Sequence, residues 1–351
     1  MQLTSRTTED VLFGTDGPVA RIVLNRPRAI NALTEPMVAD IHAQLDAWAA
    51  DDAVGAVVVQ GAGERGLCSG GDVRAVRAHV LEHGEPGAFF RTEYAMNAAV
   101  ADFPKPYVAL MDGIVMGGGV GVSGHGSIRL TTEHTRLAMP ETIIGFTPDV
   151  GAQWLLAHAP GQVGAWMAMT GETVDGTDAV AAGFADAMVA ADRMAEMAAL
   201  DGERDPWLYA VAEGAPFTGA EISYPALSAL HAGGPSRSWI DDCFVGDDPV
   251  AIIERLLDHP ERNARQAGAT LRLRCPLSVV VSLHALRRAQ RMASVHEVLA
   301  QDRRVAERLA LLPDFAEGVR AQLVDKDQRP SWSDPSVEDV DPDEVMQLFA
   351  A

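Results

Sequence analysis

The chain has 351 residues, of which 48% are hydrophobic and 22% charged, an ordinary composition for a globular protein. Its formal net charge of -21 argues against a nucleic-acid partner, because a polyanion is bound through clustered positive charge. No stretch of eighteen uncharged apolar residues occurs, so no membrane-spanning helix is expected.

The N-terminal segment and the cysteines bear on location and metal binding. Residues 1–14 lack both a basic region and an apolar region, so we expect no signal or transit peptide. The three cysteines are odd in number and have no metal-ligand spacing. We therefore expect a reduced, cytoplasmic protein with no metal site and no separate cofactor.

In the first half of the chain, strand-like and helix-like segments alternate. Residues 19–25 (VARIVLN) predict a strand, and a helix follows, with Thr34 as N-cap and apolar residues at helical spacing. Further strands are expected at 56–63, 107–113 and 127–132, and residues 74–104 are expected to be helical with a break near Gly84–Gly87. This alternation predicts an α/β fold.

From about residue 190 the chain reads mainly as helix. Loops are expected at 213–224 and 232–249, and Ser294 and Glu297 form a capping-box pattern before a helix. The acidic tail is expected to form a loop and then a short helix. We therefore predict a core region over 1–195 and a mainly helical C-terminal region over 196–351.

The run IVMGGGVGVSGHG, residues 114–126, contains the pattern G-x-G-x-x-G between Gly119 and Gly124. A dinucleotide site would need a full helix and a second parallel strand after these glycines. The next strand-like stretch begins only three residues later, at Ser127, which leaves no room for that helix. The dinucleotide interpretation is therefore rejected.

Backbone N–H groups offer a second interpretation of the same glycines. A short helix opened by glycines presents free N–H groups that stabilise an oxyanion, and one such group rarely suffices. The segment GERGLCSGGDVRAV (63–76) is another glycine turn between a strand and a helix, and it supplies a second donor. The plainer alternative, that both segments are only tight turns, is equally open at this point.

Four stretches of the first half show a resemblance. IVLNRPRAINALT (22–34), GLCSGGDVR (66–74), IVMGGGVGVS (114–123) and AMPETIIGFTPDVGAQWLL (138–156) resemble the crotonase (enoyl-CoA hydratase/isomerase) superfamily. The resemblance implies a spiral of ββα turns, in which two backbone N–H groups polarise an acyl-CoA thioester carbonyl. It places these donors at Gly71 and Gly118.

The residues at the catalytic positions of that family narrow the choice of reaction. The hydratases use two glutamates, and the first of these positions is Gly121 here, whereas the second is Glu141. Together with EYAMNAAVADFPKPYVAL and the late stretch DFAEGVRAQLVDKDQRPSW (314–332), the motifs instead resemble the 3-hydroxyisobutyryl-CoA hydrolases. Residues 152–153 depart from that subfamily, where a third glycine is usual.

The functional positions of that subfamily map onto Glu93, Gly118, Glu141 and Asp149. Glu141 is either a general base or a nucleophile that forms an anhydride, and Asp149 either binds the substrate's 3-hydroxyl or orients water. Glu93 is a weaker candidate for the hydroxyl. The structural alternatives are a solvated helix acid for Glu93, an N-cap for Asp149 and a first-turn acid for Glu141.

Coenzyme A enters as part of the substrate. Arg28 and Ala29 are candidate CoA contacts, with a solvated loop arginine as the alternative for Arg28. The resemblance places the backbone of residues 68–73, which includes Cys68, Gly70, Asp72 and Val73, beside the adenine. Cys68 is then a packing residue. Three activities are kept: a 3-hydroxyacyl-CoA thioesterase, an enoyl-CoA hydratase or isomerase, and an inactive acyl-CoA-binding protein. An acyl-CoA is the expected partner, and a homo-oligomer is left open.

Overall fold

In the computed structural model the described residues are 1–200, 204–217 and 235–350. Their contacts divide the chain into two compact units. The first, here called the sheet unit, comprises residues 1–71, 92–137 and the described part of 174–228. The second, here called the helical unit, comprises residues 72–91, 138–173 and the described part of 229–351. The two units are defined by contacts and interleave along the chain, so they do not test the predicted domain division at residue 195. That division stays a prediction.

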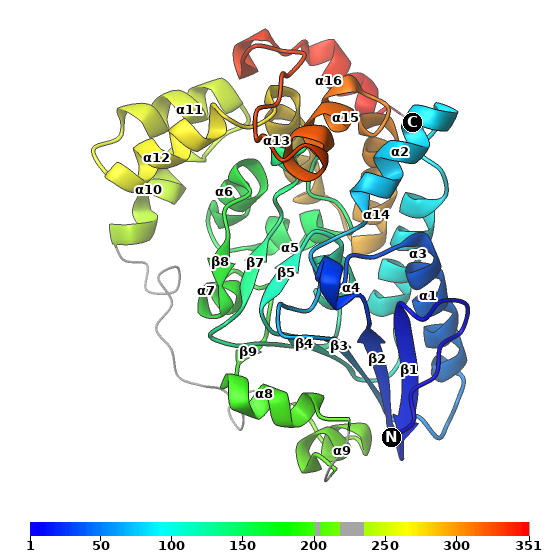
Figure 1. The fold of residues 1–351 in the computed structure, drawn as a ribbon. Helices are drawn as coiled ribbons and strands as arrows, with labels where there is room; N and C mark the ends of the chain where they lie inside the picture. Colours follow the sequence, from blue (N-terminus) through cyan, green and yellow to red (C-terminus); the bar gives the residue numbers. More distant parts are fainter. Residues whose placement is uncertain (201–203, 218–234, 351) are drawn as a thin grey trace. The chain divides into compact units, whose positions relative to one another are not determined.

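The main sheet of the sheet unit has the strand order β1-β2-β3-β4-β6-β9 among the described residues (Figure 1). β1 and β2 are antiparallel, and the remaining neighbours are parallel. These strands are β1 (Val11–Asp16), β2 (Val19–Leu24), β3 (Ala56–Gly61), β4 (Tyr107–Met111), β6 (Ile128–Thr131) and β9 (Ala187–Met188). A smaller sheet has the order β5-β7-β8, formed by β5 (Ile114–Met116), β7 (Arg136–Ala138) and β8 (Val174–Asp175).

The central strands are continuous apolar runs because both of their faces are covered. β2 and β4 are buried along their whole length. On one face, Met194, Met197 and Leu208 pack against strand residues such as Val58 and Leu130. These three residues belong to α8 and α9, which Figure 1 shows beside the sheet. The helices with all or most of their length in this unit are η1 (Pro27–Ala29), α1 (Glu35–Ala49), α3 (Phe89–Ala101), α4 (Gly118–Ser123), α7 (Gly176–Ala181), α8 (Ala191–Ala198) and α9 (Pro206–Ala212).

The helical unit is organised around α13 (Pro276–Ala289), which contacts α5, α6, α14 and α16. Its Pro276 stands in the first turn, where a missing N–H costs nothing, and ten of its fourteen residues are buried, so it serves as a core helix. The other elements are α2 (Val73–His83), η2 (Glu141–Ile143), α5 (Ala152–His158), α6 (Val163–Thr170), α10 (Pro235–Cys243), α11 (Pro249–Asp258), α12 (Arg262–Leu271), α14 (Val295–Leu309), α15 (Pro313–Val319), the π-helical turn Arg320–Val324, η4 (Val337–Asp339) and α16 (Pro342–Leu348).

Most element predictions are confirmed, including the α/β class and the mainly helical C-terminal region. The Ser294 hydroxyl accepts the Glu297 N–H at 3.3 Å and so caps α14. α4 is only six residues long and β6 begins at Ile128, which confirms that no crossover helix follows the glycine run.

The predicted loop at 232–249 is wrong over most of its described part, because α10 occupies residues 235–243. This helix forms because Trp239, Ile240 and Cys243 fall on one face and are buried. Of the other predicted loop, 213–224, only residues 213–217 belong to the described chain.

Candidate active site

The first glycine turn follows β3 and is held by backbone pairing. The N–H of Leu33 donates to the Gly70 carbonyl at 2.8 Å, and the N–H of Ser69 donates to the Ile30 carbonyl at 2.9 Å. Gly70 has a φ of +116°, a conformation that side chains other than glycine's rarely adopt. The N–H of the next residue, Gly71, donates to no backbone carbonyl in the described chain. It is therefore available as an oxyanion donor.

The second glycine turn follows β5 and opens α4. Gly117 is the N-cap residue, with φ +50° and ψ -119°, and Gly118 is the first helical residue. Its N–H belongs to the first turn of a helix, where no intrahelical acceptor exists. A Cβ placed on Gly118 would lie 3.1 Å from the Gly71 nitrogen and 2.5 Å from Oε1 of Glu93. The structure thus brings Gly71, Gly118 and Glu93 together within the sheet unit.

Glu93 lies on α3 and is only 2% exposed, so the solvated-helix interpretation of this residue is wrong. The spacing of residues along the helix, read from the sequence, indicates that Glu93 is buried. Phe90, Glu93, Asn97 and Val100 recur at three- and four-residue spacing, and all four are buried. A carboxyl group within such a stripe indicates a special site rather than a solvent-facing charge.

Glu141 and Asp149 lie on one loop of the helical unit, here called the acid loop (residues 140–151). Glu141 is the first residue of η2, and its carbonyl accepts N–H groups from Ile144 at 3.0 Å and Phe146 at 3.1 Å. The two carboxylate residues are 7% and 5% exposed, respectively. Glu141 is also a first-turn acid, so the structural alternative for it holds alongside the functional one.

α13 and the residue that precedes it anchor the acid loop. The N–H of Cys275 donates to the Thr142 carbonyl at 3.0 Å. The hydroxyl oxygens of Thr147 and Ser282 are 3.0 Å apart, a hydrogen bond between buried side chains. The helical C-terminal region therefore supports the loop that carries both candidate catalytic carboxyl groups.

The N-cap alternative for Asp149 is wrong. The N-cap residue of α5 is Gly151, with a φ of +77°, and Asp149 lies two positions before it. Instead, the Gly151 N–H donates to Oδ2 of Asp302, on α14, at 2.8 Å. Sequence reasoning missed Asp302, although it stands on the stripe Val298, Asp302, Val305, where an apolar residue is expected.

Gln153, at the position that departs from the resembled subfamily, is fully buried. Its Nε2 donates to the Pro148 carbonyl at 3.1 Å. The unusual glutamine at position 153 therefore contacts the backbone just before Asp149.

The residues expected near CoA are placed as follows. Arg28 and Ala29 form part of the exposed turn η1, and the Ser69 hydroxyl donates to the Ala29 carbonyl at 3.1 Å. Cys68 is fully buried, and burial raises the pKa of its thiol to about 12, which makes it a packing residue rather than a nucleophile. Asp72 caps α2, which begins at Val73. Their contact with CoA stays a prediction.

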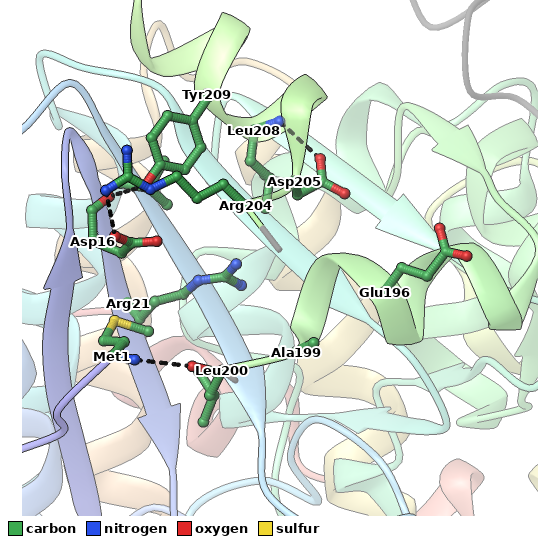
Figure 2. A pocket seen from close by; sticks show the side chains of 11 residues that line it. Met1, Asp16, Arg21, Glu196, Ala199, Leu200, Arg204, Asp205, Leu208 and Tyr209 are labelled. Carbon is green, nitrogen blue, oxygen red and sulfur yellow. Dashed lines mark hydrogen bonds and ion pairs between the residues drawn. The ribbon is translucent and has the colours of Figure 1, made fainter. Parts of the chain in front are cut away.

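A cavity of about 220 Å³ lies elsewhere in the sheet unit (Figure 2). Its charged side chains largely satisfy one another, because Arg204 pairs with Asp16 at 3.3 Å and Arg193 pairs with Asp205. Arg21 is 6% exposed, and its guanidinium donates to Oε1 of Gln60 at 2.9 Å. No predicted site residue lines this cavity, so its location does not coincide with the candidate chemistry.

Within the described ranges, no single helix is long and apolar enough to cross a membrane; only the sharply bent pair α12 and α13 meets length and composition limits when taken together. In the same ranges, no group of three or more His, Cys, Asp or Glu side chains is arranged to hold a metal ion.

Comparison with known proteins decides the family. A family model described as enoyl-CoA hydratase/isomerase matches residues 19–349. The chain belongs to the enoyl-CoA hydratase/isomerase family. Two curated relatives of the chain are named 3-hydroxyisobutyryl-CoA hydrolase, mitochondrial. The Danio rerio protein is 36% identical, covering 99% of this chain and 91% of its own length. The Homo sapiens protein is 34% identical, covering 97% and 88%.

Solved structures confirm the crotonase-like fold expected from the sequence. A structure described as a carnitinyl-CoA dehydratase from Mycobacterium thermoresistibile matches with a TM-score of 0.89 and 41% identity, over 98% of this chain and 97% of that one. A structure described as an enoyl-CoA hydratase from Rhodobacter sphaeroides matches with a TM-score of 0.88 and 36% identity, over 97% of both chains. Family membership and fold are thus shown, whereas the enzyme activities in the names of the curated relatives and of the solved structures differ.

Proposed function

We propose that this protein hydrolyses an acyl-CoA thioester, with 3-hydroxyisobutyryl-CoA as substrate and 3-hydroxyisobutyrate and CoA as products. The observation that carries the proposal is the match, over almost the whole chain, to relatives named as hydrolases of that thioester. The glycine at position 121 supports it, because the family's two-glutamate water addition lacks its first acid here. The reaction belongs to the breakdown of valine.

The proposed mechanism assigns the two glycine turns to the carbonyl. The N–H groups of Gly71 and Gly118 donate to the carbonyl oxygen and stabilise the negative charge that develops as the carbonyl carbon becomes tetrahedral. Because both donors belong to backbone fixed by β-type pairing and a helix start, they need no reorganisation during the reaction. CoA leaves as a thiolate and is then protonated.

Glu141 supplies the step that breaks the thioester. As a general base it takes a proton from the attacking water; as a nucleophile it attacks the carbonyl carbon, expels CoA and is released by water from the resulting anhydride. Asp149 is assigned to the 3-hydroxyl of the substrate, and Glu93, beside the glycine donors, is the second candidate for that hydroxyl.

The direct experiment is a thiol-release assay over a panel of acyl-CoA thioesters, with and without a 3-hydroxyl group. We expect CoA release from 3-hydroxyisobutyryl-CoA to exceed release from every thioester that lacks the hydroxyl. Absence of CoA release from the whole panel, with binding retained, would instead establish an acyl-CoA-binding protein without catalysis.

Addition of water to an enoyl-CoA is the second candidate function. The descriptions of the two structural neighbours as a dehydratase and a hydratase favour it. Gly121 discriminates between the activities. It is buried in α4, so we expect Gly121→Glu to bury a charge there and to lower thioester hydrolysis without creating hydration of crotonyl-CoA. Hydrolysis at the wild-type rate in this variant would show that position 121 does not face the substrate, and new hydration would favour the second candidate.

Asp149→Ala tests recognition of the hydroxyl. A substrate without the 3-hydroxyl cannot donate a hydrogen bond to the Asp149 carboxylate, and the loss of a hydrogen bond to a charged group costs on the order of 1–3 kcal/mol. We therefore expect the wild-type kcat/KM to favour 3-hydroxyisobutyryl-CoA over isobutyryl-CoA by about tenfold or more, and the variant to narrow this preference. Equal losses on both substrates would assign Asp149 to the water, and an unchanged ratio would shift the assignment to Glu93.

We also propose that the protein acts in the cytoplasm on an acyl-CoA. The three cysteines are free and buried, which supports a reducing compartment, whereas the curated relatives carry the word mitochondrial in their names. Fractionation of the native host's cells with antibody detection would test it, and a homo-oligomer would be tested by light scattering.

A further inference from the structure

The turn that carries Asp149 has an unusual backbone. Val150 and Gly151 both lie in the left-handed region, with φ values of +53° and +77°. A β-branched residue is strained there, and such strain persists only where the surroundings hold the backbone firmly. Val150 is 1% exposed, so the strained residue is packed inside the helical unit. The direction of the neighbouring Asp149 side chain therefore depends on whatever holds this turn.

Asp302 holds it from another element. Its Oδ2 accepts the Gly151 N–H at 2.8 Å, and Asp302 itself is 2% exposed. On the other side of Asp149, Nε2 of Gln153 donates to the Pro148 carbonyl at 3.1 Å. Without an acceptor on α14, the Gly151 N–H would be left buried and unsatisfied, which favours a different backbone path through Val150.

The two aspartates also interact through their charges. Burial, and then repulsion from Asp149, raise the pKa of the Asp302 carboxyl well above its usual range, against the opposing effect of the Gly151 N–H. A protonated Asp302 can still accept the Gly151 N–H through its carbonyl oxygen. In that form it adds no second negative charge near Asp149.

We propose that Asp302 is a positioning residue for Asp149: from α14 it fixes the strained turn at Val150–Gly151 and thereby sets the direction in which Asp149 meets the substrate's 3-hydroxyl. This inference rests on the proposed function, in which Asp149 reads that hydroxyl. Asp302 itself is assigned no contact with the substrate. It is a specificity determinant that lies 153 positions further along the chain than the residue it positions.

Three variants separate positioning from mere support of the fold. Asp302→Leu removes the acceptor and fills the space with a larger apolar side chain. Asp302→Ala removes the acceptor without adding bulk and replaces the leucine variant if that one does not fold. Asp302→Asn keeps an oxygen acceptor and carries no charge, so it mimics the protonated carboxyl. The readout is the ratio of kcat/KM for 3-hydroxyisobutyryl-CoA to that for isobutyryl-CoA, measured together with a melting curve.

We expect Asp302→Leu or Asp302→Ala to lower kcat/KM on the hydroxylated substrate by about tenfold or more, with a smaller loss on isobutyryl-CoA, since misplacing a contact group by about 1 Å is enough for such losses. Asp302→Asn should keep the wild-type ratio within about threefold. In an Asp149→Ala background, substitution of Asp302 should leave the ratio unchanged, because the group that it positions is gone.

Asp40 provides the matched control. It is a 3% exposed aspartate on α1, in the sheet unit, whose carboxylate accepts the Thr7 N–H at 2.8 Å. Asp40→Leu and Asp40→Asn should lower the melting temperature and leave the substrate ratio at its wild-type value.

Three outcomes overturn the inference, and they can be told apart. If the wild type releases CoA with the expected preference but Asp302→Leu and Asp302→Ala lose both substrates in proportion, Asp302 only supports the fold. If Asp302→Asn collapses the ratio as fully as the apolar variants do, an ionised carboxylate is required and the neutral clamp is wrong. If the wild type releases no CoA from either thioester, the proposed function fails, and the inference fails with it.

Discussion

Replacing Glu141 by glutamine is expected to lower kcat for thioester hydrolysis by about 10²-fold or more, the usual contribution of a positioned acid–base group. The amide has nearly the shape of the carboxylate but neither takes a proton from water nor attacks a carbonyl carbon. The loop should keep its conformation, because glutamine has nearly the same size and the hydrogen bonds from Ile144 and Phe146 to the residue-141 backbone carbonyl are retained. Binding of CoA should therefore survive in the variant.

The measurement is single-turnover CoA release with 3-hydroxyisobutyryl-CoA, combined with calorimetric titration of CoA. Glu172→Gln is the control, since it removes one negative charge from the same unit at a half-buried position outside the acid loop. Turnover of Glu141→Gln within a few-fold of wild type would overturn the assignment of Glu141. Intact-protein mass after an acid quench separates the two roles, because only a nucleophilic Glu141 adds the mass of the acyl group.

The elements around the glycine turns could be predicted from the sequence because their signals are local. β4 is a continuous apolar run that ends where Asp112 and Gly113 begin, and α4 is too short for a crossover helix. The assignment of Gly71 and Gly118 as candidate oxyanion donors came from the resemblance. What the structure adds is their convergence, in which Gly118 approaches the Gly71 nitrogen so closely that no side chain fits between them.

The surroundings of the acid loop could not be predicted in the same way, because they depend on residues far away along the chain. The acceptor for the Gly151 N–H is on α14, and the partner of the Thr147 hydroxyl is on α13. The sequence suggested Asp149 as the cap of the following helix, because aspartate is among the residues preferred at N-caps. Tertiary contacts overrode this preference by supplying Asp302.

The burial of polar side chains was also not predicted, although the sequence carries a pattern that indicates it. Glu93 and Asp302 each interrupt an apolar helical stripe, and both are buried. Identifying a stripe by its apolar members alone discards such residues, yet an acid at a core position is costly unless it has a specific role. In both helices the interrupted position lies beside a candidate catalytic group, Gly118 in one case and the Asp149 turn in the other.

The second large effect is expected for Gly118→Ala. The added methyl group would lie 3.1 Å from the Gly71 nitrogen, in the space where an oxyanion accepting that N–H must sit, at roughly 2.7–3.1 Å from the donor. One substitution should therefore obstruct both donors. Loss of a single oxyanion-hole donor typically costs about 10²–10³ in kcat, and we expect a decrease of at least that size. The melting temperature should also fall, because the methyl group crowds Glu93 and the backbone of Gly70 and Gly71.

Glu93 supplies the control for this experiment, because the same methyl group would also lie 2.5 Å from its Oε1. If displacement of Glu93 were the cause of the loss, Glu93→Ala would make room, and the double variant Gly118→Ala/Glu93→Ala would regain activity relative to Gly118→Ala. We expect no such recovery, since the methyl group still stands before the Gly71 N–H when the carboxylate is gone. Recovery in the double variant, or hydrolysis by Gly118→Ala at the wild-type rate, would show that the two glycine turns do not form the oxyanion hole.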